Sequence, residues 1–342
     1  MKLRAAASLV LSSLVLLLPP AGAQEPKAKQ GTTKEAETDR RIQDMLGAVV
    51  RVRMRALPDA RSNATLGQAR EGTGIVIEPG YIVTIGYLVI ESDSIEITTS
   101  AGKTFPALLA GYDHASGFGL LKVQGELGLK PLTLGESRAL NVREPVIILP
   151  YGGRDAASPA YVMSRRQFTG SWEYLLESAI FTAPPNPTWA GAGLVNRELK
   201  LVGIGSLLVR DTVEPGTPEP GNMFVPIDLL KPILEELKEK GRRNEPPRPW
   251  LGLATEEVQG RLFVTRVSPE GPADQAGLKQ GDIVVGVGND SVKTHADLYR
   301  KMWALGAAGV EVPLKIQQGG TVREVRVKSI DRFQYFKTKQ VN

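Results

Sequence analysis

Short apolar segments separated by turn signals run from about residue 49 to residue 209. Within this region Ile95 and Ile97 alternate with polar residues, which is the pattern of a strand with one buried face. A Pro79-Gly80 pair lies between two apolar runs. It predicts a type II turn that closes a hairpin, because proline presets φ and glycine accepts positive φ. Many short strands at close spacing predict a mainly β fold and leave the choice between a sandwich and a barrel open.

The composition excludes several classes of site. The chain has 342 residues and no cysteine, so it has room for two domains and a tail but no thiol nucleophile, disulfide or thiolate metal site. A net charge of +5, without basic runs interleaved with aromatic residues, gives no support for nucleic-acid binding. His114 and His295 are the two histidines of the chain and have no paired carboxylate spacing. We therefore expect no metal and no cofactor.

The N-terminal segment has the pattern of a secretory signal peptide. Lys2 and Arg4 precede an apolar stretch over residues 5–18, and small residues follow up to Ala23. The pattern predicts a signal peptide over residues 1–23, cleaved after Ala23, and a secreted or periplasmic protein. The apolar stretch is short for a membrane span, and an uncleaved anchor is the alternative.

Polar composition and proline mark the boundaries of the first domain. Residues 24–41 are rich in Lys, Glu, Thr and Gln and predict a flexible spacer, with a short helix over residues 39–46. Asp228 is the expected N-cap of a helix with one apolar stripe that ends at Gly241. The proline-rich residues 244–249 predict a stiff linker to a second domain.

Four motifs of the first domain resemble those of HtrA-type, trypsin-like serine proteases. They are the Gly-Thr-Gly run that opens the domain and the runs that hold the catalytic histidine, the catalytic acid and the nucleophile. These runs lie at residues 72–84, 84–89, 113–119 and 186–196. The resemblance implies a domain of two six-stranded β-barrels over residues 42–243, and the family's habit of forming trimers implies a possible homo-oligomer.

The catalytic positions of this resemblance hold none of the expected side chains. Tyr87 lies at the histidine position, Gly117 at the acid position and Ala190 at the nucleophile position. Alanine offers no attacking oxygen, a phenol with a pKa of about 10 is a poor base at neutral pH, and glycine orients nothing. The sequence therefore predicts no catalytic residue and a serine-protease homologue that is not an enzyme.

Two further features of the cleft remain open at this point. Thr188 and Trp189 replace the residues that shape the oxyanion hole in the family, and Trp189 either plugs the cleft or offers an apolar face to a peptide. His114, next to Asp113 and near Ser116, suggests an alternative triad. It is disfavoured because neighbours in one loop rarely point at a common centre.

Residues 250–331 resemble an HtrA-type PDZ domain over their whole length, and residues 332–342 form a tail. Residues 268–284 match the family's Ser-Pro-Ala-x-x-Ala-Gly-Leu-x-x-Gly-Asp run. The resemblance implies a small α+β domain in which residues 250–253 form a carboxylate-binding loop. Gly252 lets several N–H groups converge on a peptide's terminal carboxylate, while the following strand edge pairs with the peptide.

The second helix of this domain begins at Thr294, its expected N-cap. His295, Leu298 and Met302 share one face of it and are candidate lining residues. The alternatives are that Leu298 and Met302 are plain core and that His295 is a solvated surface residue. The predicted peptide-binding residues are Trp250, Leu251, Gly252, Leu253, His295, Leu298 and Met302.

The sequence supports three hypotheses about function. The leading one is an exported, inactive HtrA-like protein that binds peptides or protein C-termini through its PDZ domain, as a scaffold, a chaperone or a regulatory partner of an active HtrA-type protease. The second is an active HtrA-like serine endopeptidase with unorthodox catalytic residues. The third gives the whole function to the PDZ domain, with the β domain as a spacer.

Overall fold

The computed structural model describes residues 30–338, so the predicted signal peptide and cleavage site lie outside the described residues. The described chain divides between residues 40 and 41 into two units. Helix α1 (Gln30–Gly47) takes up most of the segment for which the sequence predicts a spacer. Its Lys, Glu, Gln, Arg and Ala residues are good helix formers, which explains the early start of the helix. In the described part of the chain, no helix combines the length and the apolar character that a membrane span requires.

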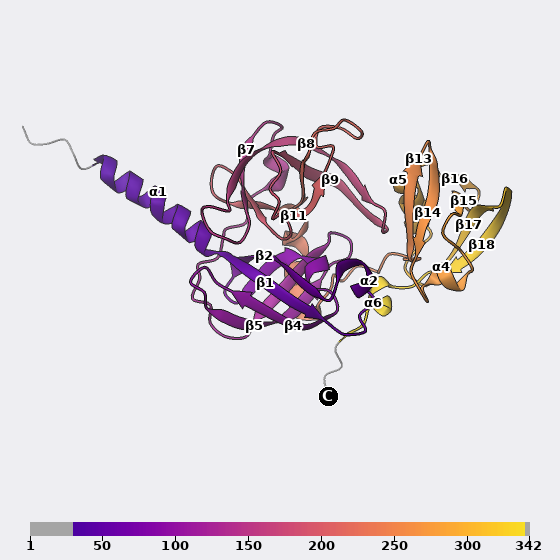
Figure 1. Cartoon of the computed structure of the whole chain (residues 1–342), viewed down its shortest axis with the longest axis horizontal. Coiled ribbons are helices and arrows are strands. Elements are labelled where there is room, and N and C mark those ends of the chain that lie inside the picture. Colours follow the sequence, from indigo (N-terminus) through magenta and orange to yellow (C-terminus); the bar gives the residue numbers. More distant parts are fainter. Residues whose placement is uncertain (1–29, 339–342) are drawn as a thin grey trace, which may run out of the picture. The chain divides into compact units, whose positions relative to one another are not determined.

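The first β-barrel closes in the strand order β1-β2-β3-β6-β5-β4. Its strands β1, β2, β4 and β5 are labelled in Figure 1. Alternate residues of β1 are buried, and the β2–β3 hairpin turns at Gly80, whose φ of 76° requires glycine, as the sequence predicts. The elements are β1 (Val49–Ala56), α2 (Asn63–Leu66), β2 (Ala69–Glu78), β3 (Tyr81–Ile85), η1 (Gly86–Leu88), β4 (Ser92–Thr98), β5 (Thr104–Tyr112) and β6 (Phe118–Val123).

The second β-barrel closes in the order β10-β11-β12-β9-β8-β7. Strands β8 and β9 form a long antiparallel hairpin whose turn is made by residues 171–173. The elements are η2 (Ser137–Ala139), β7 (Pro145–Leu149), β8 (Ser158–Gly170), β9 (Tyr174–Ala183), β10 (Gly193–Val195), β11 (Leu201–Val209) and β12 (Gly221–Pro226). The predicted architecture of two six-stranded barrels is confirmed.

A helical segment follows the second barrel. The sequence predicts one helix that begins at Asp228, but the segment consists of two short 3₁₀ turns before the α-helix. Pro232 explains the interruption, because it lacks the N–H that a continuous helix needs. Gly241 ends the helix in the left-handed conformation, as predicted. The elements are η3 (Ile227–Leu229), η4 (Lys231–Ile233) and α3 (Leu234–Lys240).

The C-terminal domain is a sheet with the order β13-β14-β15-β17-β18, in which β13 is an edge strand and β16 pairs with β15. Helix α5 begins as predicted, with the Thr294 hydroxyl accepting a hydrogen bond from the Asp297 amide at 3.1 Å. The elements are β13 (Leu253–Val258), β14 (Arg261–Val267), α4 (Pro272–Gln275), β15 (Ile283–Val287), β16 (Asp290–Ser291), α5 (His295–Trp303), β17 (Glu311–Gln318), β18 (Thr321–Lys328) and α6 (Arg332–Tyr335). The predicted small α+β domain is therefore confirmed.

Candidate functional site

The fold brings the three predicted catalytic positions around the end of β3. Tyr87 lies in η1 directly after Gly86, and the Gly86 amide donates to the Gly117 carbonyl at 2.7 Å. Ala190 is tied to the neighbouring strand, since the Thr73 amide donates to its carbonyl at 2.9 Å. Strand β3 and its partner β2 therefore hold all three positions in one region.

The phenol of Tyr87 is engaged on both sides. It donates a hydrogen bond to the Ser206 carbonyl at 2.8 Å and is hydrogen-bonded to the side chain of Trp189. Burial raises the pKa of Tyr87, and the Trp189 hydrogen bond only partly opposes this shift. The phenol therefore stays protonated at neutral pH, with the half-buried Trp189 lying against it.

The loop before Ala190 is fixed by a pair of buried amide side chains. The backbone amide of Asn186 donates to Asn222 Oδ1 at 2.7 Å, and Asn222 Nδ2 donates to the backbone carbonyl of Asn186 at 3.1 Å. Asn186 Oδ1 in turn accepts a hydrogen bond from the Thr188 amide at 2.8 Å. An oxyanion bound in this loop would compete with Asn186 for the Thr188 donor.

The alternative triad at residues 113–116 does not assemble. Asp113 accepts hydrogen bonds from the amide and the hydroxyl of Ser116, and Arg243 binds both of its carboxylate oxygens at 2.7 and 2.8 Å. Burial raises the pKa of Asp113, but the hydrogen bonds and charge of Arg243 outweigh it, so the pKa is lowered. The hydroxyl of Ser116 is thus committed to a carboxylate and not to a histidine.

His114 points into an aromatic cage instead. Its ring lies 4.4 Å from the Tyr112 ring and 4.3 Å from the Phe333 ring, measured between centroids. Neither ring nitrogen has a hydrogen-bond partner among the described residues. Burial lowers the pKa of His114, and the charges of Arg332 and Arg242 lower it further. His114 is therefore a neutral packing residue in this arrangement.

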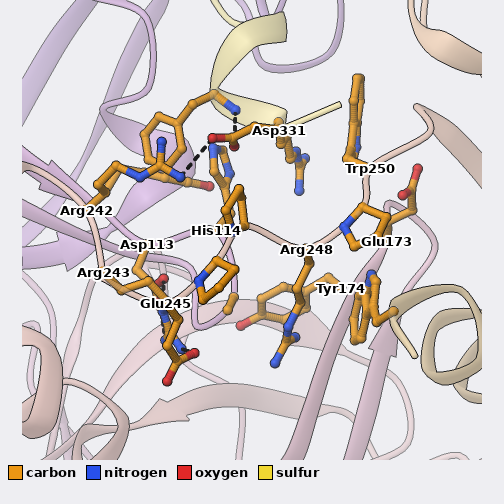
Figure 2. A pocket seen from close by; sticks show the side chains of 18 of the residues that line it. Asp113, His114, Glu173, Tyr174, Arg242, Arg243, Glu245, Arg248, Trp250 and Asp331 are labelled. Atoms are coloured by element: carbon orange, nitrogen blue, oxygen red, sulfur yellow. Dashed lines mark hydrogen bonds and ion pairs between the residues drawn. The ribbon is translucent and has the colours of Figure 1, made fainter. Parts of the chain in front are cut away.

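A cavity of about 90 Å³ lies beside His114, along the linker that leads to the C-terminal domain (Figure 2). Arg242, just before the linker, pairs with Asp331 at 2.8 Å, while its neighbour Arg243 pairs with Asp113. These ion pairs connect the segment that leads into the linker with the first barrel and with the end of the C-terminal domain. The charged lining residues are Asp113, Glu173, Arg242, Arg243, Glu245, Arg248, Asp331 and Arg332.

The predicted carboxylate-binding loop has the geometry that the sequence suggests, and a carboxylate of the chain itself occupies it. The amide of Leu251 donates to Glu173 Oε2 at 3.0 Å, and the amides of Gly252 and Leu253 donate to Oε1 at 2.7 and 2.9 Å. Gly252 has a φ of 81°, which allows the three N–H groups to converge. The loop therefore binds a carboxyl group of the chain itself.

Glu173 is buried in this position. Burial raises its pKa to about 7, although the three loop amides and the charge of Arg332 act in the opposite direction. The carboxyl group thus changes its charge near neutral pH, which is uncommon for a glutamate. Sequence reasoning missed Glu173, because a polar hairpin turn gives no local sign of a contact with a distant loop.

The residues that precede Glu173 in the turn contact β13 and α5, the two elements that border the groove of the C-terminal domain. The Thr255 amide of β13 donates to the Ser171 carbonyl at 3.1 Å. The Tyr299 hydroxyl of α5 donates to the Gly170 carbonyl at 2.7 Å and accepts from the Glu173 amide at 3.1 Å. Tyr299 follows His295 by one helical turn, and this spacing could have added it to the candidate lining residues.

The predicted lining residues of α5 have mixed environments. His295 is buried, with Nε2 2.9 Å from the Thr255 carbonyl and Nδ1 3.0 Å from Glu257 Oε1. Leu298 and Met302 belong to the buried core of the C-terminal domain. Trp250 packs against the Tyr335 ring at 4.6 Å between centroids. Their roles in peptide binding stay predictions.

Comparisons with known proteins identify both domains. Residues 72–204 match the family model of a trypsin-like peptidase domain, and residues 249–329 match that of a PDZ domain. The chain is 27% identical over 295 residues to the "Probable periplasmic serine endoprotease DegP-like" of Ectopseudomonas mendocina, covering 80% of this chain and 60% of that relative. It is 27% identical over 259 residues to the "Serine endoprotease DegS" of Escherichia coli, covering 71% of each chain.

A solved structure supports the fold. The HtrA-type protease AlgW with a decapeptide superposes with a TM-score of 0.51 at 16% identity, covering 88% of this chain and 98% of the other. The chain thus spans about three fifths of the DegP-like relative and most of AlgW.

These comparisons contradict one prediction from the sequence. The residues at the catalytic positions led to the prediction that the chain is not an enzyme. Its relatives, however, are named serine endoproteases, and this favours an enzyme of that class. The prediction rested on the side chains at the three catalytic positions, on the altered oxyanion-hole residues and on the disfavoured alternative triad at residues 113–116.

Proposed function

We propose that this chain, which carries the domain pair of the HtrA-type proteins, binds the C-termini of peptides or proteins through the PDZ groove. The pair consists of a trypsin-like peptidase domain followed by a PDZ domain. The observation that carries this proposal is the convergence of three amides, from Leu251, Gly252 and Leu253, on one carboxylate. A terminal carboxylate of a peptide offers the same acceptor atoms.

The rest of the groove supplies the contacts that such a peptide needs. Strand β13 is an edge strand, so its outer backbone groups can pair with an added strand. Leu251 and Leu253 flank the loop with apolar side chains, which favours partners with apolar C-terminal residues. The proposed partners are peptides, unfolded proteins or an HtrA-type protease, and a homotrimer is the proposed assembly.

We further propose that the chain is exported. Its relatives are named as periplasmic proteins, and the N-terminal pattern is that of a signal peptide. The expected mature protein begins at Gln24. The intact mass of the protein recovered from a periplasmic extract tests this, since retention of residues 1–23 would contradict cleavage after Ala23.

Binding is tested with a labelled decapeptide that has an apolar C-terminal residue, measured by fluorescence anisotropy. The free-acid peptide is expected to bind the full chain at least about tenfold more tightly than its C-terminal amide, because hydrogen bonds to a charged acceptor contribute about 1.5–3 kcal/mol. Equal affinity of the two peptides would count against the proposal.

A pair of glycine variants provides the matched control. Gly252→Ala is expected to abolish binding, because a Cβ at a φ of 81° is strained and meets Ser268 at 3.0 Å. Gly260→Ala places the same strain, at a φ of 71°, in a hairpin turn where a Cβ meets no atom within 4 Å. The Gly260 variant should retain binding.

Endopeptidase activity is the second candidate function, favoured by the names of the relatives. We propose that Tyr87, Gly117 and Ala190 occupy the catalytic positions, so hydrolysis would require a nucleophile from another residue of the cleft. Cleavage of unfolded casein by protein purified from a protease-deficient host tests this function. Loss of that cleavage in a Tyr87→Phe variant would locate it in this cleft.

A further inference from the structure

The turn of the β8–β9 hairpin contacts the C-terminal domain as a peptide ligand would. Its carboxylate, on Glu173, fills the loop of Leu251, Gly252 and Leu253 through hydrogen bonds of 2.7–3.0 Å. Two residues before Glu173, the Ser171 carbonyl accepts a hydrogen bond from the amide of Thr255 in the edge strand β13. A carboxylate in the loop and a backbone bond to β13 are the two elements of peptide capture by strand addition.

Further contacts hold the hairpin in place. Tyr299 bonds to the backbone on both sides of the turn, at Gly170 and at Glu173. On the outer face, Arg300 of α5 binds Glu177 at 2.7 Å and Gln167 at 2.7 Å. Leu175, the second residue of β9, packs into the core of the C-terminal domain. The hairpin thus occupies the groove with side-chain, backbone and apolar contacts together.

The backbone of the turn is strained in this position. Glu173 has a φ of 60°, which is unfavourable for a residue with a Cβ by about 1 kcal/mol or more. The surrounding hydrogen bonds compensate for this cost while the hairpin is docked.

We infer that residues 170–173 are an internal ligand of the PDZ groove, with Glu173 in the place of a C-terminal carboxylate, and that a partner's C-terminus binds by displacing them. The inference rests on the proposed function and adds its regulation. Only molecules whose hairpin is released can bind the partner, so the apparent affinity is reduced by the released fraction. Because the hairpin belongs to the second barrel, occupancy of the groove is linked to the position of a barrel loop.

The first test compares peptide affinity in full-length variants. Glu173→Ala removes the internal carboxylate and should bind the free-acid decapeptide at least about tenfold more tightly than the unaltered protein. Tyr299→Phe keeps the ring but loses both backbone contacts, and it should tighten binding by a smaller factor. Glu126→Ala, at an exposed glutamate that follows β6 of the first barrel, is the control and should leave the affinity unchanged. Equal affinity in all four proteins would refute the internal ligand.

The second test needs no peptide. Hydrogen exchange of the amides at residues 251–253 should be slow in the unaltered protein and at least about tenfold faster in Glu173→Ala, because the carboxylate protects them. Unchanged exchange would refute the inference even if peptides bind. Faster exchange in a variant that captures no peptide would instead support the internal contact and reject the proposed binding function.

Discussion

Glu173 is a buried carboxyl group whose ionised form is disfavoured, since burial raises its pKa to about 7 from an ordinary value of 4.5. Between these two values the docked, folded state binds more protons than the unfolded state. The stabilising effect of the docked carboxyl is therefore complete below pH 4.5 and is lost as the pH rises through about 7. The ionisable groups that interact with it are Tyr299 of α5 and Arg332 of α6, and those that line the adjoining cavity are Asp113, His114, Arg242, Arg243, Glu245, Arg248 and Asp331.

This pKa predicts a pH-dependent groove. The affinity of the full chain for the free-acid decapeptide should increase from pH 5 to pH 8, by up to about two orders of magnitude, because ionised Glu173 is released more readily. The carboxylate of the free peptide is ionised across this range. Anisotropy titrations at several pH values measure the effect. Glu173→Ala should bind with nearly constant affinity, and an equal slope in that variant would assign the pH dependence to another group.

The ion pair of Asp113 with Arg243 is the second residue-scale feature with a measurable consequence. Arg243→Ala leaves a carboxylate buried without its partner, and we expect a loss of about 3 kcal/mol in the free energy of unfolding. Arg138→Ala breaks an ion pair in which the arginine side chain is 80% exposed, so its effect should stay below about 1 kcal/mol. Urea unfolding of the two variants makes the comparison, and equal losses would contradict the assigned role of burial.

At the scale of elements, the features that sequence reasoning predicted correctly depend on neighbouring residues. The turn at Gly80 and the N-cap at Thr294 follow from side chains within a few positions of each other. The single helix expected from Asp228 failed because Pro232 interrupts the backbone hydrogen bonds. Docking of Glu173 into a loop 78 residues later could not be predicted, since it depends on how two folded domains meet. The loop itself was predictable, and its occupant was not.

The N-cap of α5 offers an element-scale test. Thr294→Ala removes the acceptor for the Asp297 amide and should lower the free energy of unfolding by about 1 kcal/mol. Thr294→Ser keeps an acceptor oxygen and should stay close to the unaltered protein. The midpoints of urea unfolding give both values. A serine variant as unstable as the alanine variant would point to lost packing of the threonine methyl group.

At the scale of the whole molecule, the hairpin couples the PDZ groove to the second barrel, because it is either docked in the groove or displaced by a ligand. A saturating free-acid decapeptide should slow hydrogen exchange at residues 251–255 and speed it at residues 170–176, because the peptide replaces the hairpin. The C-terminal amide of the same peptide is the control and should change neither segment. Protection of the groove without faster exchange in the hairpin would show that both ligands fit side by side.

Strand β13 lies at the edge of its sheet, and this position has a consequence for the solubility of the protein at high concentration. Uncovered strand edges invite pairing between copies of a chain and hence aggregation. Residues 170–173 cover the start of that edge in each molecule through the Thr255–Ser171 hydrogen bond. Release of the hairpin in the absence of a peptide ligand would expose the backbone groups of this strand edge. Concentrated solutions should therefore remain clear at mildly acidic pH and become turbid as the pH rises.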